Sequence, residues 1–203
     1  MIYKYSRHSG LFLLLIITTS LLSFNVTGDR HVNDFSLKNV NGKLVSLKDY
    51  PKAKGFIIVF TCNHCPFAKL YFPRLNELNR KYLAADVPLI AVSSSDTVVY
   101  EDDTYPKMKE KAKKEKFGFP YLFDEQQAVA KNFSAQKTPH AFVIWKEQGK
   151  YVIKYSGAID DNGANPEKVK NHYVANAVDA LLNGKEVSEK ETKSIGCQVN
   201  FRK

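Results

Sequence analysis

The chain has 203 residues, 44% of them hydrophobic and 25% charged, and its formal net charge is +9. This composition excludes a disordered chain, and the length suits one domain of ordinary size with a short extension. A domain this long buries a sizeable core without disulfide staples, so the three cysteines are not a structural framework and need another explanation.

The first segment has the pattern of a targeting sequence. Lys4 and Arg7 precede an almost wholly apolar run at residues 11–24, and Val26 and Gly28 suit a cleavage site before Asp29. The run is shorter than the roughly 20 residues of a transmembrane helix, although an uncleaved anchor stays an alternative. We therefore predict that residues 1–28 are a signal peptide or membrane anchor. The protein would then be secreted, periplasmic or membrane-anchored, facing an extracytoplasmic compartment.

The following segments alternate between strand and helix patterns. Asn41-Gly42 is a strong turn signal between two short extended pieces and predicts an N-terminal hairpin. The unbroken apolar run at residues 55–60 suits a strand buried on both faces of a sheet. Residues 68–83 then have helical periodicity, with Pro73 expected to kink the helix.

The second half continues the alternation up to a polar tail. The expected strands are residues 87–92, 121–123, 141–145 and 151–155, and the expected helices are residues 104–116, 126–133 and a last one from Pro166 to Asn183-Gly184. The pattern predicts an α/β fold with a central mixed sheet flanked by helices. We assign residues 29–184 to this domain and residues 185–203 to a C-terminal tail that contains Cys197.

Much of the positive charge lies in the lysine-rich stretch of residues 107–116. No aromatic residues interleave with these lysines, and no nucleic-acid motif appears in the chain. We interpret the stretch as a solvated helix face and predict no nucleic-acid partner.

Cys62 and Cys65 follow the buried strand and have two residues between them. Such a pair serves either metal binding or redox chemistry, but a structural zinc site needs four ligands and the remaining cysteine is distant. A pair at a strand-to-helix junction favours a redox role, because unpaired N–H groups and the helix dipole stabilise a thiolate there. Cys62 is then expected to be the more exposed nucleophile, and Cys65, one turn into the helix, the resolving thiol. His64 either tunes the pair or points into solvent.

The arrangement of strand, Cys62-Asn63-His64-Cys65, helix and then Thr138-Pro139 before a hairpin resembles the thioredoxin superfamily. Within it, the start DFSLKNVNGKLVSLKDY and the Gly196-Cys197 ending resemble the peroxiredoxin-like branch of AhpC/TSA-type redoxins. The resemblance implies a thioredoxin-like fold. It also implies that Pro139 is a cis-proline facing the cysteine pair and that Thr138 offers backbone hydrogen bonds to substrate.

The sequence also departs from that branch. Peroxidatic cysteines follow Pro-x-x-x-Thr/Ser-x-x-Cys, whereas Val59 stands where the hydroxyl residue is expected and Gly55 where the proline is expected. We therefore predict a thiol–disulfide oxidoreductase that acts on protein or small thiols and is recycled by a redox partner, with no cofactor. A thiol peroxidase is the alternative enzyme.

Two further alternatives stay open at this point. Cys197 is a candidate second resolving thiol, an intermolecular link or an inert residue, since an odd cysteine in an exported chain needs an explanation. A copper or zinc module would use Cys62, Cys65 and His140, because His140 follows Pro139 directly.

Overall fold

The computed structural model describes residues 1–2 and 30–202, so the predicted signal peptide or anchor lies outside the described residues apart from its first two. Within this described part, no helix is both long enough and apolar enough to cross a membrane. The strands are β1 His31–Val32, β2 Ser36–Asn39, β3 Leu44–Ser46, β4 Gly55–Phe60, β5 Leu89–Ser93, β6 Tyr121–Phe123, β7 Lys137–Thr138, β8 His140–Glu147, β9 Lys150–Gly157 and β10 Cys197–Gln198. The helices are α1 Pro66–Lys69, α2 Phe72–Leu83, α3 Tyr105–Lys114, α4 Ala128–Phe133 and α5 Tyr173–Leu182, with 3-10 turns at Leu47–Asp49, Glu101–Asp103 and Pro166–Lys168.

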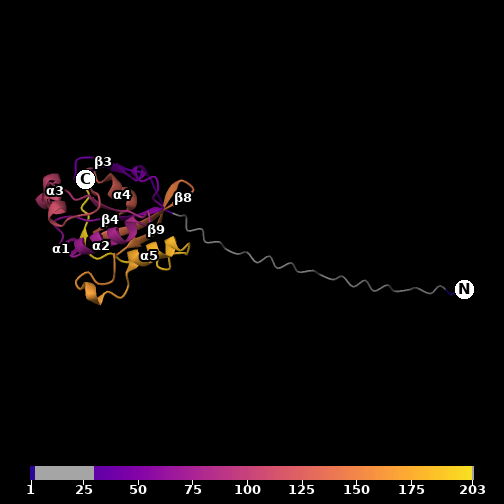
Figure 1. Cartoon of the computed structure of the whole chain (residues 1–203). Helices are drawn as coiled ribbons and strands as arrows, with labels where there is room; N and C mark the ends of the chain where they lie inside the picture. Colours follow the sequence, from indigo (N-terminus) through magenta and orange to yellow (C-terminus); the bar gives the residue numbers. More distant parts are fainter. Residues whose placement is uncertain (3–29, 203) are drawn as a thin grey trace.

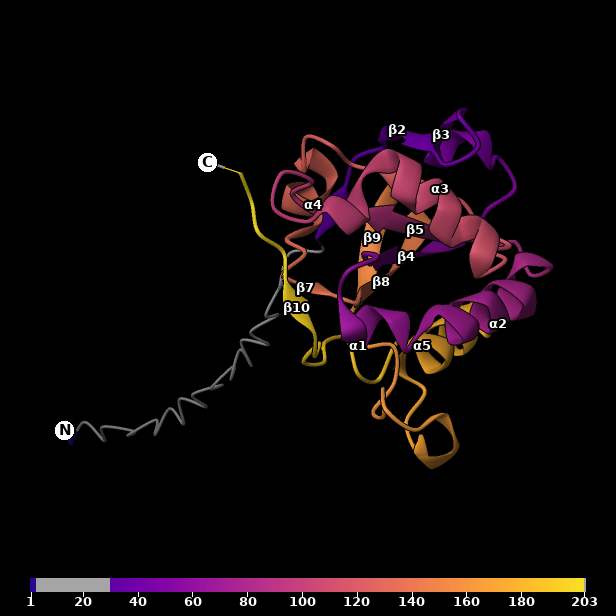
Figure 2. The same cartoon turned by 90° about the vertical axis from the view of Figure 1, so that its left-hand side faces the viewer.

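Eight of the described strands form one mixed sheet in the order β1-β9-β8-β4-β5-β6-β2-β3. β5 pairs in parallel with β4 and β6, and β8 pairs antiparallel with β4 and β9. Helices cover the sheet on both faces (Figures 1 and 2). The predicted α/β fold with a central mixed sheet is confirmed.

The central strand β4 is buried along its whole length, as its apolar sequence predicted. Its side chains alternate between two hydrophobic clusters. Ile57 and Val59 pack with α2 and α5, while Phe56, Ile58 and Phe60 pack with α4 on the opposite face. Burial on both faces fixes the end of β4, and with it the start of the cysteine loop, in the middle of the sheet.

The N-terminal hairpin is also as predicted. β2 and β3 pair antiparallel, with Ser36 opposite Ser46. Gly42 in the turn has a φ of +87°, which glycine adopts without the strain that a Cβ would cause. The hairpin extends the sheet because β2 also pairs with β6.

The helix predicted at residues 68–83 is two helices in the structure. α1 ends at Lys69 and α2 begins at Phe72, so Pro73 lies in the first turn of a new helix instead of kinking a continuous one. A proline costs nothing in a first turn because that N–H has no acceptor within the helix. The break turns α2 along the sheet and leaves α1 beside the cysteines.

The last predicted helix begins later than the sequence suggested. Pro166 opens only a short 3-10 turn, and α5 starts at Tyr173. The intervening loop is held by the Asp161 carboxylate, which accepts bonds from the backbone N–H groups of Lys170 and Asn171. These bonds compete with helix formation there, and a sequence pattern does not reveal them.

The chain after α5 returns to the site. β10 pairs antiparallel with β7, with Cys197 opposite Thr138. Figure 2 shows β10 alongside β7, next to the start of α1. The tail therefore lies against the domain at the turn that precedes β8.

Candidate active site

Cys62 and Cys65 lie in the connection between β4 and α1. Cys65 is the N-cap of α1, so the helix begins after it, and the expectation that Cys65 lies one turn inside is wrong. Both cysteine side chains are 0% exposed, so the expectation that Cys62 is the more exposed is also wrong. Bonds from the N–H groups of Asn63 and His64 to Asp103 hold these residues out of the helix, and the packing around the pair buries both sulfurs.

Thr138 connects the two cysteines to the far side of the sheet. The Cys62 thiol donates to Thr138 Oγ1 at 3.2 Å, and the Cys65 thiol donates to the Thr138 carbonyl at 3.1 Å. The Thr138–Pro139 peptide bond is cis, as the resemblance implied. A residue far along the chain thus positions both sulfurs by direct hydrogen bonds.

Cys197 is the third sulfur of the site. Cys62, Cys65 and Ala68 form a small buried cluster against which Cys197 packs. Cys65 lies within hydrogen-bonding reach of both Cys62 and Cys197. The three thiols therefore form a chain with Cys65 in the middle, and Cys197 contacts Cys65 rather than Cys62.

The hydrogen bonds of this chain favour a single thiolate that the coupled pair Cys62 and Cys65 share, with the larger share on Cys65. Hydrogen bonding from the Cys62 thiol, together with that from Cys197 and the N–H of Ala68, lowers the pKa of Cys65 to about 4. Ionisation of Cys65 loses its bond to the Thr138 carbonyl, and the single S–H proton of Cys62 turns from Thr138 Oγ1 to the Cys65 thiolate. Several donors to a thiolate outweigh these neutral bonds because charge-assisted bonds are stronger. The bond to Cys65 and burial raise the pKa of Cys62 far above its ordinary value. Burial, followed by the bond to Cys65, raises the pKa of Cys197 to about 11.

These shifts predict the pH dependence of the reduced protein. Thiolate absorbance at 240 nm should show one step near pH 4 and the next near pH 11, instead of three steps near the ordinary value of 9.0. Between pH 4 and 9 the unfolded chain binds one proton more than the folded protein, so stability should rise with pH. Above pH 9 the folded protein retains protons that the unfolded chain has lost, so stability should fall.

Cys65→Ser is the control for this titration, because it removes the central sulfur. The step near pH 4 should disappear in the variant. A wild-type protein whose thiols all ionise near pH 9 would contradict the assignment of the thiolate to Cys65.

Asp103 is a site residue that the sequence analysis missed. Its side chain is 0% exposed, and Oδ1 accepts from the backbone N–H groups of Asn63 at 2.5 Å and His64 at 3.3 Å. These bonds hold the loop between the cysteines, and they explain why the helix starts only after Cys65. The acidic run Glu101-Asp102-Asp103 is visible in the sequence, but nothing in it shows which carboxylate points inward.

His64 is fixed between two partners. Its Nδ1 pairs with Oδ2 of Asp103, and its ring stacks on Tyr100 with centroids 3.8 Å apart. The His64 side chain is only 18% exposed, so it does not point freely into solvent. His64 lies beside the cysteine pair but is bound to Asp103. An effect of His64 on the pKa of Cys62 therefore depends on the Asp103 carboxylate as well.

The predicted metal site with His140 is not assembled. His140 bonds to Ser156 Oγ at 3.1 Å and accepts from the N–H of Gln136 at 3.3 Å, and burial lowers its pKa to about 4. Within residues 1–2 and 30–202, only Cys62, His64 and Asp103 bring three donor atoms within 4.8 Å of one another. Two of these donors already pair with each other, so a metal would have to displace an existing bond.

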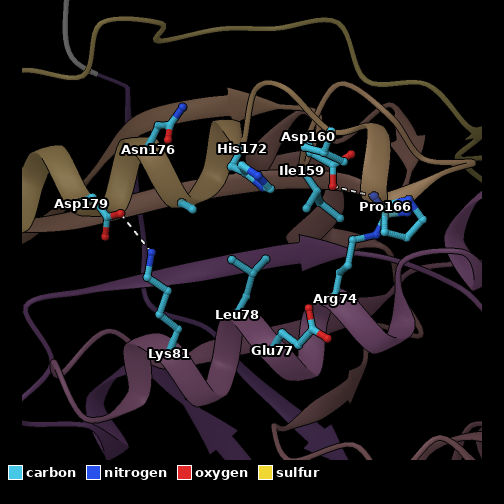
Figure 3. A pocket seen from close by; sticks show the side chains of 12 residues that line it. Arg74, Glu77, Leu78, Lys81, Ile159, Asp160, Pro166, His172, Asn176 and Asp179 are labelled. Atoms are coloured by element: carbon cyan, nitrogen blue, oxygen red, sulfur yellow. Dashed lines mark hydrogen bonds and ion pairs between the residues drawn. The ribbon is translucent and has the colours of Figure 1, made fainter.

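A cavity of about 370 Å³ lies elsewhere, between α2 and α5 (Figure 3). Four of the charged residues that line it form two ion pairs, since Arg74 binds Asp160 at 2.6 Å and Lys81 binds Asp179 at 3.0 Å. None of the predicted site residues lines this cavity. We therefore regard it as a structural feature of the helix packing.

Comparison with known sequences identifies relatives of the chain. The profile described as the AhpC/TSA family matches residues 29–161. The thiol-disulfide oxidoreductase ResA of Bacillus thuringiensis subsp. konkukian is 27% identical over 124 residues. That match covers 61% of this chain and 66% of the relative, so it spans just under two thirds of the relative's length.

Solved structures show the same architecture. An uncharacterized conserved protein from Geobacillus kaustophilus is 35% identical, with a TM-score of 0.78 over 86% of this chain and 92% of that protein. A putative thiol:disulfide interchange protein DsbE from Chlorobium tepidum is 19% identical, with a TM-score of 0.58 over 76% of this chain and 96% of that protein. The second likeness concerns the fold alone, and it confirms the predicted thioredoxin-like architecture.

Proposed function

Because the chain belongs to the AhpC/TSA family, we propose that it is a thiol–disulfide oxidoreductase that uses Cys62 and Cys65 on protein thiols and disulfides outside the cytoplasm. The observation that carries the proposal is the binding of both sulfurs by one residue, Thr138, at the cis-proline turn. The name of the ResA relative supports the same activity. Cys62 is the nucleophile of the proposal and Cys65 the resolving thiol.

Reduction of a substrate disulfide proceeds in two exchanges. Cys62 passes its proton to the Cys65 thiolate and attacks one substrate sulfur, so that the substrate S–S bond breaks and a mixed disulfide forms. The departing substrate thiolate takes the proton from Cys65. Cys65 then attacks the Cys62 sulfur, forms the Cys62–Cys65 disulfide and releases the second substrate thiolate. Two electrons pass from the protein to the substrate, and a dithiol partner restores them.

Equilibration of the protein with glutathione or dithiothreitol buffers over a series of reduction potentials tests this proposal. The pair should interconvert between dithiol and disulfide, which alkylation and mass measurement detect, and reduced protein should consume bis(2-hydroxyethyl) disulfide. A protein whose three thiols stay reduced at every buffer potential and that leaves this small disulfide intact would refute the activity.

A thiol peroxidase is the second candidate, and family membership favours it. The surroundings of Cys62 oppose it, because Val59 replaces the hydroxyl residue of the peroxidatic motif and the Cys62 thiol is bound to Thr138. Consumption of hydrogen peroxide with a dithiol reductant discriminates the two activities. We expect peroxide consumption to remain far below disulfide exchange.

We assign the protein to an extracytoplasmic compartment on the pattern of residues 1–28. Expression of the full chain in a bacterium, followed by fractionation and N-terminal sequencing, tests the assignment. A start at or near Asp29 in the exported fraction indicates cleavage, and an intact leader in the membrane fraction indicates a tether. Full-length protein in the cytoplasmic fraction would contradict both.

A further inference from the structure

The C-terminal strap, which we define as residues 194–202, lies across the cysteine site. We propose that it occupies the edge of β7 to which a substrate binds, and that it takes the place of a substrate there. The same edge then accepts an extended polypeptide that has a cysteine preceded by glycine and, before the glycine, by an apolar residue. This inference rests on the proposed function and names its substrate class. Ile195-Gly196-Cys197 is the template for the backbone path and for the two residues before the cysteine. The Cys197 sulfur itself contacts Cys65, so a substrate sulfur takes a position nearer Cys62 when it is attacked.

The strap is bound as a strand. β10 pairs antiparallel with β7, placing Cys197 opposite Thr138, and the N–H of Val199 donates to the carbonyl of Gln136 at 2.9 Å. Thr138 is the residue that binds both active-site sulfurs. A strand added to a sheet edge is a general mode of peptide recognition, in which main-chain bonds provide affinity and pockets provide specificity.

The fit at Gly196 explains the required glycine. A Cβ at this position would lie 2.1 Å from the Thr138 carbonyl oxygen and 2.7 Å from its carbon. Both atoms belong to the backbone, so neither can move aside without displacing the turn that holds the cysteines. Only a residue without a side chain allows the strand to approach so closely.

An apolar surface lies beside this edge. A cavity of about 320 Å³ is lined by residues that include Phe67, Leu70, Pro139 and Ile195. Phe67 is 45% exposed, Leu70 is 44% exposed and Ile195 is 67% exposed. Ile195 covers the cavity only loosely, so the apolar side chain of another segment, two residues before its cysteine, can replace it there.

The strap also closes the site. Cys62 and Cys65 are 0% exposed while it is bound, so a protein substrate cannot reach either sulfur in this state. The Asn200 side chain donates to the Tyr100 hydroxyl at 2.8 Å, and the Tyr100 ring stacks on His64. Exchange with a protein therefore requires the strap to leave the edge that the substrate then uses.

The contacts of the strap's end are polar and partly exposed, which suits release. Gln127 bonds to the Asn200 carbonyl at 2.7 Å and to the N–H of Arg202 at 2.7 Å. Arg202 also pairs with Asp96 at 2.9 Å. Exposed ion pairs contribute little to stability, so segments held by them open at modest cost.

The test compares Gly196→Ala with wild type and with Gly118→Ala, whose added Cβ would meet only ordinary contacts of 3.6 Å or more. The probe is the peptide Ser-Ile-Gly-Cys-Gln-Val-Asn, its cysteine joined by a disulfide to 5-thio-2-nitrobenzoate. Reduced protein, in a single turnover, converts the probe to peptide thiol and free 5-thio-2-nitrobenzoate while Cys62 and Cys65 become a disulfide. The coloured product gives the rate.

We expect Gly196→Ala to release the product about tenfold faster than wild type or Gly118→Ala, because the variant loses the closed state. Arg202→Ala, which loosens the strap away from Thr138, should also be faster than wild type. Thermal unfolding shows whether Gly196→Ala folds. If it does not fold, Arg202→Ala still tests the proposal. For every folded variant, a peptide with alanine in place of glycine should react more slowly than the glycine peptide.

Bis(2-hydroxyethyl) disulfide separates the two proposals. One outcome is that this disulfide is consumed, Gly196→Ala and Arg202→Ala release 5-thio-2-nitrobenzoate no faster than wild type, and the two peptides react equally. The strap then does not occupy a substrate site, while the oxidoreductase activity stands. If neither the small disulfide nor the peptides react, the proposed function itself fails.

Discussion

Replacement of Cys62 by serine should lower the rate of disulfide exchange by about 10³-fold or more, because removal of the attacking atom leaves only the contribution of binding. Cys65→Ser should behave differently. Its Cys62 can still attack, but the thiol that resolves the mixed disulfide is missing. A substrate–Cys62 adduct should therefore accumulate, and mass spectrometry under non-reducing conditions detects it.

Cys197→Ser is the matched control, because it removes a sulfur of the same cluster and keeps the backbone of β10. Cys197 contacts Cys65 and has no described bond to Cys62, so we expect the adduct in Cys65→Ser to persist as long as in Cys65→Ser/Cys197→Ser. Faster decay of the adduct in the single variant would show that Cys197 resolves it. Unchanged exchange in Cys62→Ser would overturn the assignment of the nucleophile.

Replacement of Asp103 by alanine should lower the free energy of unfolding by about 1–3 kcal/mol, because the buried N–H of Asn63 loses its acceptor. Asp103→Asn should cost less, since an amide oxygen can still accept from the loop. Urea unfolding of the reduced proteins measures both changes. Asp102→Asn is the matched control, because its side chain is exposed next to Asp103 and the same charge is removed.

The charge of Asp103 has a second, separable effect. It contributes to the raised pKa of Cys62, after the bond to Cys65 and burial. Asp103→Asn should therefore lower the pKa of Cys62 and speed its alkylation at alkaline pH, although the protein is less stable. A variant with an unchanged alkylation profile would show that Asp103 only supports the loop.

Local patterns decided the parts of the fold whose signal is complete within a few residues. The run at β4, the Asn41-Gly42 turn and the β8–β9 hairpin follow from burial periodicity and turn chemistry, and the structure has all three. The junction that carries Cys62 and Cys65 followed from the same patterns. Helix boundaries were less predictable, because side chains such as Asp161 take backbone N–H groups from a distance.

The sequence by itself determined that Cys62 and Cys65 lie where a buried strand meets a helix, and its resemblance to the thioredoxin superfamily implied that Thr138-Pro139 faces them. Only the tertiary structure decided that Asp103 holds their loop, that His140 is absent from the site and that Cys197 joins it. The Asp103–Asn63 contact links residues 40 positions apart, and Cys197 lies still farther along the chain from Cys65. Whether such residues meet depends on the path of the whole chain. The burial of Cys62 also depends on the tertiary structure. Segments distant in the sequence, β7 and β10 among them, pack around the cysteine pair, and both sulfurs are buried.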